Sequence, residues 1–352
     1  MSAPVLLNAL IHHADPPAAD PLPLIFLHGV FGNANNWAGI LRRLHPRYKT
    51  VSMDLRNHGE SPHTPRMSYP AMAADVLATL DHLDIERCSV IGHSMGGKVA
   101  MALAHLAPQR FQSVVIEDIA PVAYSDRYSS MIAALLAAPD SLMLSRQQIH
   151  DALSAHVPNP QTLAFLLQNY RRGETRWTWR CNLVAIRDSL EELLGFPDFE
   201  PLGAQTAMQA EAATDRVDIM GTVAPEDSVS PEGAVNPKDL VGPEGPVNPK
   251  KIMSPENTED LAGAADMTGV GGGGTPDTDG RNAAPNLIPR VTLIAAGPRG
   301  LAHDAASHQA FLQHFPTGEI VTIAEAGHWV HVDAPDAFEQ RLIEALYAPA
   351  DA

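Results

Sequence analysis

A chain of 352 residues, of which 45% are hydrophobic, can bury a large core as one large domain or two ordinary ones. Its formal net charge of −17 argues against nucleic acid or an anionic membrane surface as a partner. Two cysteines exclude a disulfide framework and a cysteine-based metal site, and they fit a reducing compartment. No apolar run reaches membrane-spanning length, and no Lys or Arg precedes Arg42 as a secretion or transit signal would require. We therefore expect a cytoplasmic protein.

The first third of the chain alternates apolar runs with amphipathic stretches. We expect strands at residues 5–13, 24–32, 49–55, 89–91 and 111–119, and helices at 37–44, 70–84 and 99–106. Alternation of this kind predicts an α/β fold with a mostly parallel, doubly wound sheet. Ligands of such sheets bind beyond the carboxyl ends of the strands.

A Gly-x-Ser-x-Gly turn, centred on Ser94, joins the strand expected at 89–91 to the helix after it. A nucleophilic serine needs such a corner, because its hydroxyl must stand clear of a strained backbone. The amide of Met95 and the helix dipole would then face an oxyanion formed beside Ser94. The motif alone arises by chance in roughly one chain in ten of this length.

The same stretch, Gly92 to Lys98, also matches most of a phosphate-binding P-loop. Position 99 is Val, where a Ser or Thr would have to hold magnesium. We therefore prefer the serine nucleophile to a nucleotide site.

The apolar run at 24–32 ends in a Gly-rich corner, where free backbone amides can face a ligand. We expect the second oxyanion donor there to be the amide of Val30, with Phe31 as the second choice. An ordinary strand-to-helix turn is the alternative. His58, in the loop after the next strand, is interpreted as a turn residue beside Gly59 rather than as a catalytic base.

Between about residues 123 and 200 the pattern changes to amphipathic helices, expected at 128–137, 145–156, 160–171 and 181–194. Because no strand alternates with them, we interpret them as a cap inserted over the nucleophile. Trp177 and Trp179 interrupt these helices, and they either line the substrate pocket or pack within the cap.

Residues 201–288 have another composition, with no aromatic residue and fourteen acids against five bases. A six-residue period with a proline at the second position of every unit begins at Ala224. We expect an acidic, disordered insertion rather than a β-helix, because so few proline-bearing units could bury little. A protein partner of this segment is unknown.

Order is expected to resume with strands at 290–297 and 318–324 and helices at 304–315 and 334–347. His328 stands at a Gly corner directly after the last of these strands, where it can lean towards Ser94. We prefer it to His331 as the catalytic base. Glu117 and Asp118 end the strand at 111–119, and only one of them can face the site.

Several motifs together resemble the α/β-hydrolase superfamily, in particular the branch of YbfF-type bacterial esterases and their eukaryotic mitochondrial relatives. They are Leu27-His-Gly-Val-Phe-Gly, Asp54-Leu-Arg-Asn-His-Gly-Glu-Ser-Pro, Met67-Ser-Tyr, Ile91-Gly-His-Ser-Met-Gly-Gly-Lys, Asp118-Ile-Ala-Pro-Val, Trp179-Arg-Cys-Asn-Leu and Ala326-Gly-His-Trp-Val-His. The implied organisation is a core at 1–122, a helical cap at 123–200, the insertion at 201–288 and the second part of the core at 289–352. The resemblance implies that Asp118 is the triad acid, with Asp304 as the alternative. It also leaves a mitochondrial location open.

We therefore expect a serine hydrolase with a Ser94, His328 and Asp118 triad, and with Val30 and Met95 forming the oxyanion hole. Its substrate would be a small-molecule ester, or a thioester, of a small to medium acyl group. Neither a metal nor an organic cofactor is expected. The alternative is a ligand receptor of the same fold that turns over slowly or only once.

Overall fold

The computed structural model describes residues 3–14, 22–203 and 288–347, all of which belong to one compact unit. Apart from its two ends, the predicted insertion at 201–288 lies outside the described residues. Within these ranges no helix is long and apolar enough to cross a bilayer.

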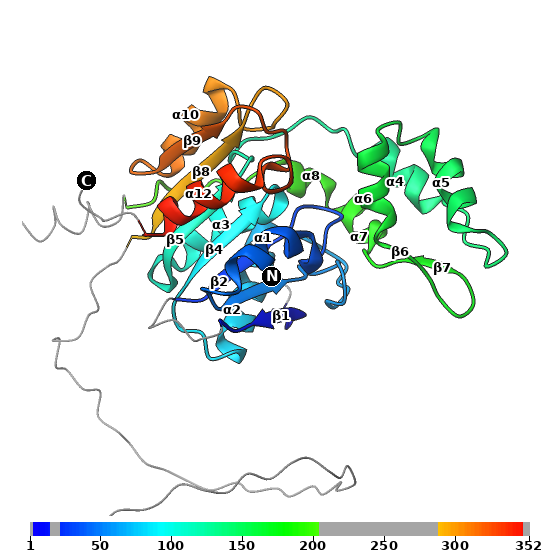
Figure 1. The fold of residues 1–352 in the computed structure, drawn as a ribbon, viewed down its shortest axis with the longest axis horizontal. Coiled ribbons are helices and arrows are strands. Elements are labelled where there is room, and N and C mark those ends of the chain that lie inside the picture. Colours follow the sequence, from blue (N-terminus) through cyan, green and yellow to red (C-terminus); the bar gives the residue numbers. More distant parts are fainter. Residues whose placement is uncertain (1–2, 15–21, 204–287, 348–352) are drawn as a thin grey trace, which may run out of the picture. The chain divides into compact units, whose positions relative to one another are not determined.

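A seven-stranded sheet forms the centre of the fold, with the strand order β1-β3-β2-β4-β5-β8-β9 (Figure 1). Only β1 is antiparallel to its neighbour. The strands are β1 (Ala9–His12), β2 (Leu24–Leu27), β3 (Thr50–Met53), β4 (Cys88–His93), β5 (Phe111–Glu117), β8 (Arg290–Ala296) and β9 (Glu319–Ile323). The expected mostly parallel, doubly wound sheet is confirmed. Its register pairs His93 with Glu117, which brings the carboxyl ends of β4 and β5 to one edge.

Helices cover both faces of this sheet (Figure 1). They are η1 (Ala34–Trp37), α1 (Ala38–Leu44), α2 (Tyr69–His82), α3 (Met95–Leu106), η2 (Pro108–Arg110), α10 (Ala305–His314), α11 (Val330–Asp333) and α12 (Pro335–Tyr347). Alternate residues of β5 enter different apolar clusters. Val114 packs in the cluster that contains Met101 of α3, and Val115 packs in the one that contains Phe338 of α12. A strand buried on both faces explains the continuous apolar runs of the sequence.

Five helices and a short hairpin follow β5, and we call residues 123–200 the cap (green in Figure 1). Its elements are α4 (Ser129–Leu136), α5 (Arg146–Ser154), α6 (Pro160–Leu167), β6 (Tyr170–Arg172), β7 (Trp177–Trp179), α7 (Leu183–Asp188) and α8 (Leu190–Leu194).

The expectation of a cap without strands is wrong at the tryptophans. Strands β6 and β7 form an antiparallel pair in which Tyr170 lies opposite Trp179, with ring centroids 4.4 Å apart. A cross-strand aromatic pair stabilises a hairpin, and this contribution is not visible in the helical periodicity of the sequence. Trp179 donates its indole N–H to the Leu135 carbonyl, 2.9 Å away, and Trp177 is buried, so both pack within the cap.

The helix expected at 181–194 is interrupted at Ser189. The Ser189 hydroxyl accepts the Met67 amide at 2.9 Å, which fixes this break to the core. Farther along, the Tyr69 hydroxyl donates to the Leu193 carbonyl at 2.6 Å. The end of the cap is therefore anchored by polar contacts with the segment that precedes and begins α2.

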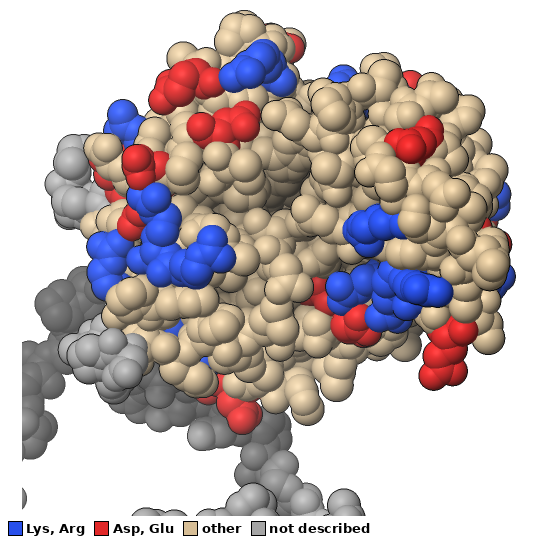
Figure 2. Space-filling model, turned by 45° about the vertical axis from the view of Figure 1, so that its right-hand side comes forward, with Lys and Arg blue, Asp and Glu red and all other residues tan. Residues whose placement is uncertain are grey.

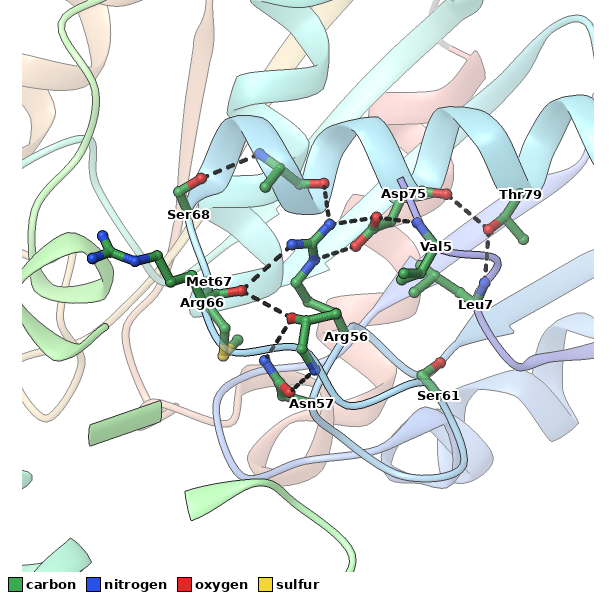
Figure 3. A network of polar contacts seen from close by, with 12 residues as sticks. Val5, Leu7, Arg56, Asn57, Ser61, Arg66, Met67, Ser68, Asp75 and Thr79 are labelled. Carbon is green, nitrogen blue, oxygen red and sulfur yellow. Dashed lines mark hydrogen bonds and ion pairs between the residues drawn. The ribbon is translucent and has the colours of Figure 1, made fainter. Parts of the chain in front are cut away.

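A buried ion pair fixes the loop at 54–62, which follows β3. Two nitrogens of Arg56 contact the two carboxylate oxygens of Asp75 at 2.5 and 2.6 Å, and both side chains are fully buried. Asp75 also accepts the Val5 amide, so one carboxylate joins the loop, α2 and the N-terminal segment (Figure 3). Breaking one partner of such a pair would leave an uncompensated buried charge. The loop at 54–62 is therefore held in one position relative to α2 and the N-terminal segment.

Candidate active site

Ser94 stands on a strained corner between β4 and α3, with φ 52° and ψ −118°. The turn requires glycine on both sides. A Cβ on Gly92 would lie 2.1 Å from the Gly96 carbonyl oxygen, and one on Gly96 would lie 2.3 Å from the Leu27 oxygen. These contacts explain the Gly-x-Ser-x-Gly spacing.

His328 follows β9 and donates from Nδ1 to Asp118 Oδ2 over 2.8 Å. The same carboxylate, fully buried, accepts three backbone amides from the last residue of β8 and the segment after it. They belong to Ala296, Leu301 and Ala302, at 3.1, 2.8 and 3.2 Å. Because its acceptor positions are filled by three amides and the imidazole, the carboxylate is held in one orientation. This arrangement fixes the imidazole tautomer that leaves Nε2 free to take a proton.

The two alternative residues of the sequence analysis have other partners. Asp304 is exposed, and its carboxylate caps α10 by accepting the Ser307 amide at 2.7 Å. His331 is buried and places Nδ1 2.8 Å from Glu117 Oε1, while its ring stacks on Trp37 at 4.4 Å. Burial opposes ionisation of Glu117, but the contacts with His331 keep the pKa of that carboxyl below its usual value. Asp118 is thus the acid that the structure brings to His328.

The backbone of residues 29–32, which we call the oxyanion loop, lies beside Ser94, with Val30 and Phe31 lining the same cavity as Ser94 and Met95. The Phe31 amide donates to Nε2 of His58 at 3.1 Å. Among the described residues, neither the Val30 amide nor the Met95 amide has a hydrogen-bond partner. Of the two candidates in this loop, Val30 is therefore the one whose N–H remains available to an oxyanion.

His58 does more than occupy a turn. Its Nδ1 donates to the Arg56 carbonyl at 3.0 Å, so Nε2 is the acceptor for Phe31. Burial and the nearby His28 lower the pKa of His58 to about 3, so the ring is neutral and keeps that acceptor. The pattern of the sequence did not reveal this contact, because its partners are 27 residues apart.

His93 is a second histidine whose role the sequence analysis missed. Its Nε2 donates to the His328 carbonyl at 2.9 Å, and the two rings lie 4.6 Å apart. Burial lowers the pKa of His93 to about 3. A neutral His93 therefore links the corner at Ser94 to the loop that carries His328.

Two cavities meet at Ser94. The smaller encloses about 40 Å³ and is lined largely by apolar and tyrosine side chains, among them Tyr69, Ile119 and Leu190. The larger is an open cleft of about 880 Å³ that also contains His328 and residues of the cap. Figure 2 shows a hollow whose walls carry few charged side chains. Ser94 thus borders a small space on one side and a wide one, which also contains His328, on the other.

Lys98 occupies a position that rules out a phosphate-binding role. The residue is 1% exposed, and its ammonium donates to three carbonyls: those of Val122, Leu194 and Gly195, at 2.9, 3.0 and 2.6 Å. Burial lowers the pKa of Lys98 to about 7. The three hydrogen bonds join α3 to Val122, directly before the cap, and to Leu194 and Gly195 near its end, and no donor is left for a nucleotide.

A sequence profile described as the alpha/beta hydrolase fold matches residues 23–172. The esterase YbfF of Escherichia coli strain K12 is 38% identical over 175 residues, which are 49% of this chain and 67% of that protein. The chain belongs to the α/β-hydrolase family. A protein named sn-1-specific diacylglycerol lipase ABHD11, from Danio rerio, is 38% identical over 51% of this chain, but the match spans only 60% of its own length.

Among solved structures, one called a marine microorganism esterase superposes on this α/β-hydrolase with a TM-score of 0.68 at 23% identity. The superposition covers 97% of this chain and 99% of the other. It bears on the fold alone. In the described ranges of this α/β-hydrolase, no group of three or more His, Cys, Asp or Glu side chains is arranged to hold a metal ion.

Proposed function

We propose that this α/β-hydrolase is a carboxylic ester hydrolase that acts through an acyl-enzyme on Ser94. One observation carries the proposal: Ser94 and His328 line one cleft, and His328 is oriented by the buried carboxylate of Asp118. Relatives named esterase and lipase support the same reaction class. We propose a small-molecule ester as the substrate of the protein.

In the proposed reaction, Nε2 of His328 takes the Ser94 proton as the oxygen attacks the acyl carbonyl. The amides of Val30 and Met95 stabilise the oxyanion of the tetrahedral intermediate. His328 then gives the proton to the leaving oxygen or sulfur. Water repeats the sequence, activated by the same histidine, and releases the acid.

The two cavities suggest which part of the substrate goes where. The leaving group must lie near His328, which lines the wide cleft but not the small cavity. We therefore propose that the acyl group occupies the small cavity, where about 40 Å³ has room for only a short chain. We propose esters of small acyl groups with a larger alcohol or thiol.

A steady-state assay on p-nitrophenyl esters from acetate to dodecanoate, with the unsubstituted chain and Ser94→Ala, tests the proposal. We expect turnover that favours the shorter acyl groups and disappears in Ser94→Ala while thermal unfolding remains cooperative. An Ala variant that keeps most of its activity would contradict the nucleophile. Stoichiometric acylation of Ser94 without further turnover would instead support the receptor alternative. Matched acyl thioesters in the same series separate the two leaving-group classes.

A further inference from the structure

Asn169 joins the cap to the oxyanion loop. It lies between α6 and β6 and is 1% exposed. Its backbone belongs to the cap, since its N–H donates to Leu166 at 3.0 Å and its carbonyl accepts the Arg180 amide at 2.8 Å. Its side chain contacts the core instead: Nδ2 donates to the Phe31 carbonyl, and Oδ1 accepts from Asn33 Nδ2 at 3.0 Å. Every polar group of this buried side chain is thus used between the two layers.

The peptide that Asn169 contacts is strained. Phe31 has a φ of 61°, in the left-handed region that a bulky residue rarely adopts. Such a conformation persists only where its surroundings fix it from several sides. Here the Phe31 amide is held by His58 of the core, and its carbonyl is held by Asn169 of the cap.

This strained residue directly follows the proposed oxyanion donor. A hydrogen bond of 3.0 Å from the Gly32 amide to the Gly29 carbonyl closes the turn around Val30. The Gly32 N–H shares a peptide group with the Phe31 carbonyl, and the Gly29 carbonyl shares one with the Val30 N–H. The direction of the Val30 N–H therefore depends on the orientation of the peptide groups on either side of Phe31. Oxyanion donors act by being fixed before the reaction, and displacements of about 1 Å can cost roughly 100-fold in rate.

We infer that Asn169 is a positioning residue for the oxyanion hole, through which the cap controls the transition state as well as the shape of the cleft. This inference rests on the proposed esterase function. Asn169 touches no reacting atom. It acts through the Phe31 carbonyl on the neighbouring Val30 amide.

The cap offers a matched control in Asn182. Its amide N–H donates to the Asn57 carbonyl at 2.8 Å, and its Nδ2 donates to Asn57 Oδ1 at 3.2 Å. It too joins cap and core by a side-chain amide, but its partner lies in the loop at 54–62 and not in the oxyanion loop. A substitution there should weaken the attachment of the cap without turning the Val30 amide.

The experiment compares Asn169→Asp with Asn182→Asp, since each replaces the donating amide by an oxygen and changes the size of the side chain little. We expect Asn169→Asp to lower kcat roughly 10- to 100-fold with KM changed less than about twofold. Asn182→Asp should keep kcat within about twofold, even if its melting temperature falls by as much as that of Asn169→Asp. The inhibition constant of butylboronic acid, which forms a tetrahedral adduct with a nucleophilic serine, should rise in Asn169→Asp by a factor similar to the loss of kcat.

Unchanged kcat in a folded Asn169→Asp would overturn the inference and leave the esterase proposal intact. So would a loss of kcat with unchanged boronate affinity, or an equal loss in both variants. If Asn169→Asp does not fold, Asn169→Ser, which is smaller and uncharged, is subject to the same comparison with Asn182→Ser. Absence of Ser94-dependent hydrolysis in the unsubstituted chain would overturn the proposed function and this inference with it.

Discussion

The imidazole of His328 and the carboxylate of Asp118 meet over 2.8 Å although they are 210 residues apart in the chain. One follows β9 and the other follows β5, so the contact spans the carboxyl edge of the sheet across β8. The carboxylate has no exposure to solvent and is held by three further amides. A neutral histidine oriented in this way carries its proton on Nδ1 and leaves Nε2 as the acceptor.

Asp118→Asn should therefore lower kcat by about 10⁴-fold while the chain still folds, because the amide favours the wrong imidazole tautomer. Steady-state kinetics on a short-chain p-nitrophenyl ester measure this loss. Asp304→Ala is the matched control. It should destabilise the protein by about 1 kcal/mol through loss of the α10 cap and leave kcat nearly unchanged. The reverse pattern would assign the acid to Asp304.

The sequence was sufficient to predict the sheet and the glycine corners at which Ser94 and His328 stand, because each depends on a local pattern of strand, corner and helix. The choice of Asp118 over Asp304 as the proposed acid rested on the family resemblance. Glu117 and Asp118 are neighbours at the end of β5, and the local sequence does not indicate which of them contacts His328.

The supporting contacts could not be predicted in this way. Lys98, His58 and Asn169 act on backbone atoms 24 to 138 residues away, and a backbone carbonyl or amide has no residue type that could reveal the contact. The β6–β7 hairpin was missed for a related reason. Its stability comes from the pairing of Tyr170 with Trp179 across the strands, which a search for helical period does not register.

Lys98→Met should cost about 3 kcal/mol in the free energy of unfolding, because the carbonyls of three half-buried residues lose their donor. Urea unfolding followed by tryptophan fluorescence measures the change. Lys49→Met, at a half-buried position, is the control and should alter stability by about 0.5 kcal/mol or less. Equal stability of the two variants would show that the three hydrogen bonds do not hold the cap.

Buried neutral histidines should make the protein sensitive to acid. The pKa of His58 is about 3 in the folded chain, against 6.5 ordinarily. Between these values the unfolded chain binds a proton that the folded chain does not, so stability falls as pH falls below about 6.5. The slope for one such group is about 1.4 kcal/mol per pH unit.

His58→Gln should reduce that slope by about one proton, because glutamine offers an acceptor to the Phe31 amide and does not titrate. Urea unfolding at a series of pH values between 4 and 7 measures the slopes. The exposed His156, changed to Gln, controls for the mere loss of a histidine. Equal slopes in the unsubstituted chain and His58→Gln would contradict a neutral, buried His58.

The small cavity should set the length of the acyl group. Leu190 lines that cavity from the cap, so Leu190→Ala should admit acyl chains longer by about two methylene groups. The ratio of kcat/KM for octanoate to that for butyrate esters of p-nitrophenol should rise. Leu163→Ala is the matched control, since Leu163 is also buried in the cap but lines neither cavity. Both substitutions remove the same side-chain atoms and should destabilise the protein to a similar extent. Only Leu190→Ala should change the preference for acyl chain length. A longer optimum in both variants, or in neither, would place the acyl group in the wide cleft beside His328.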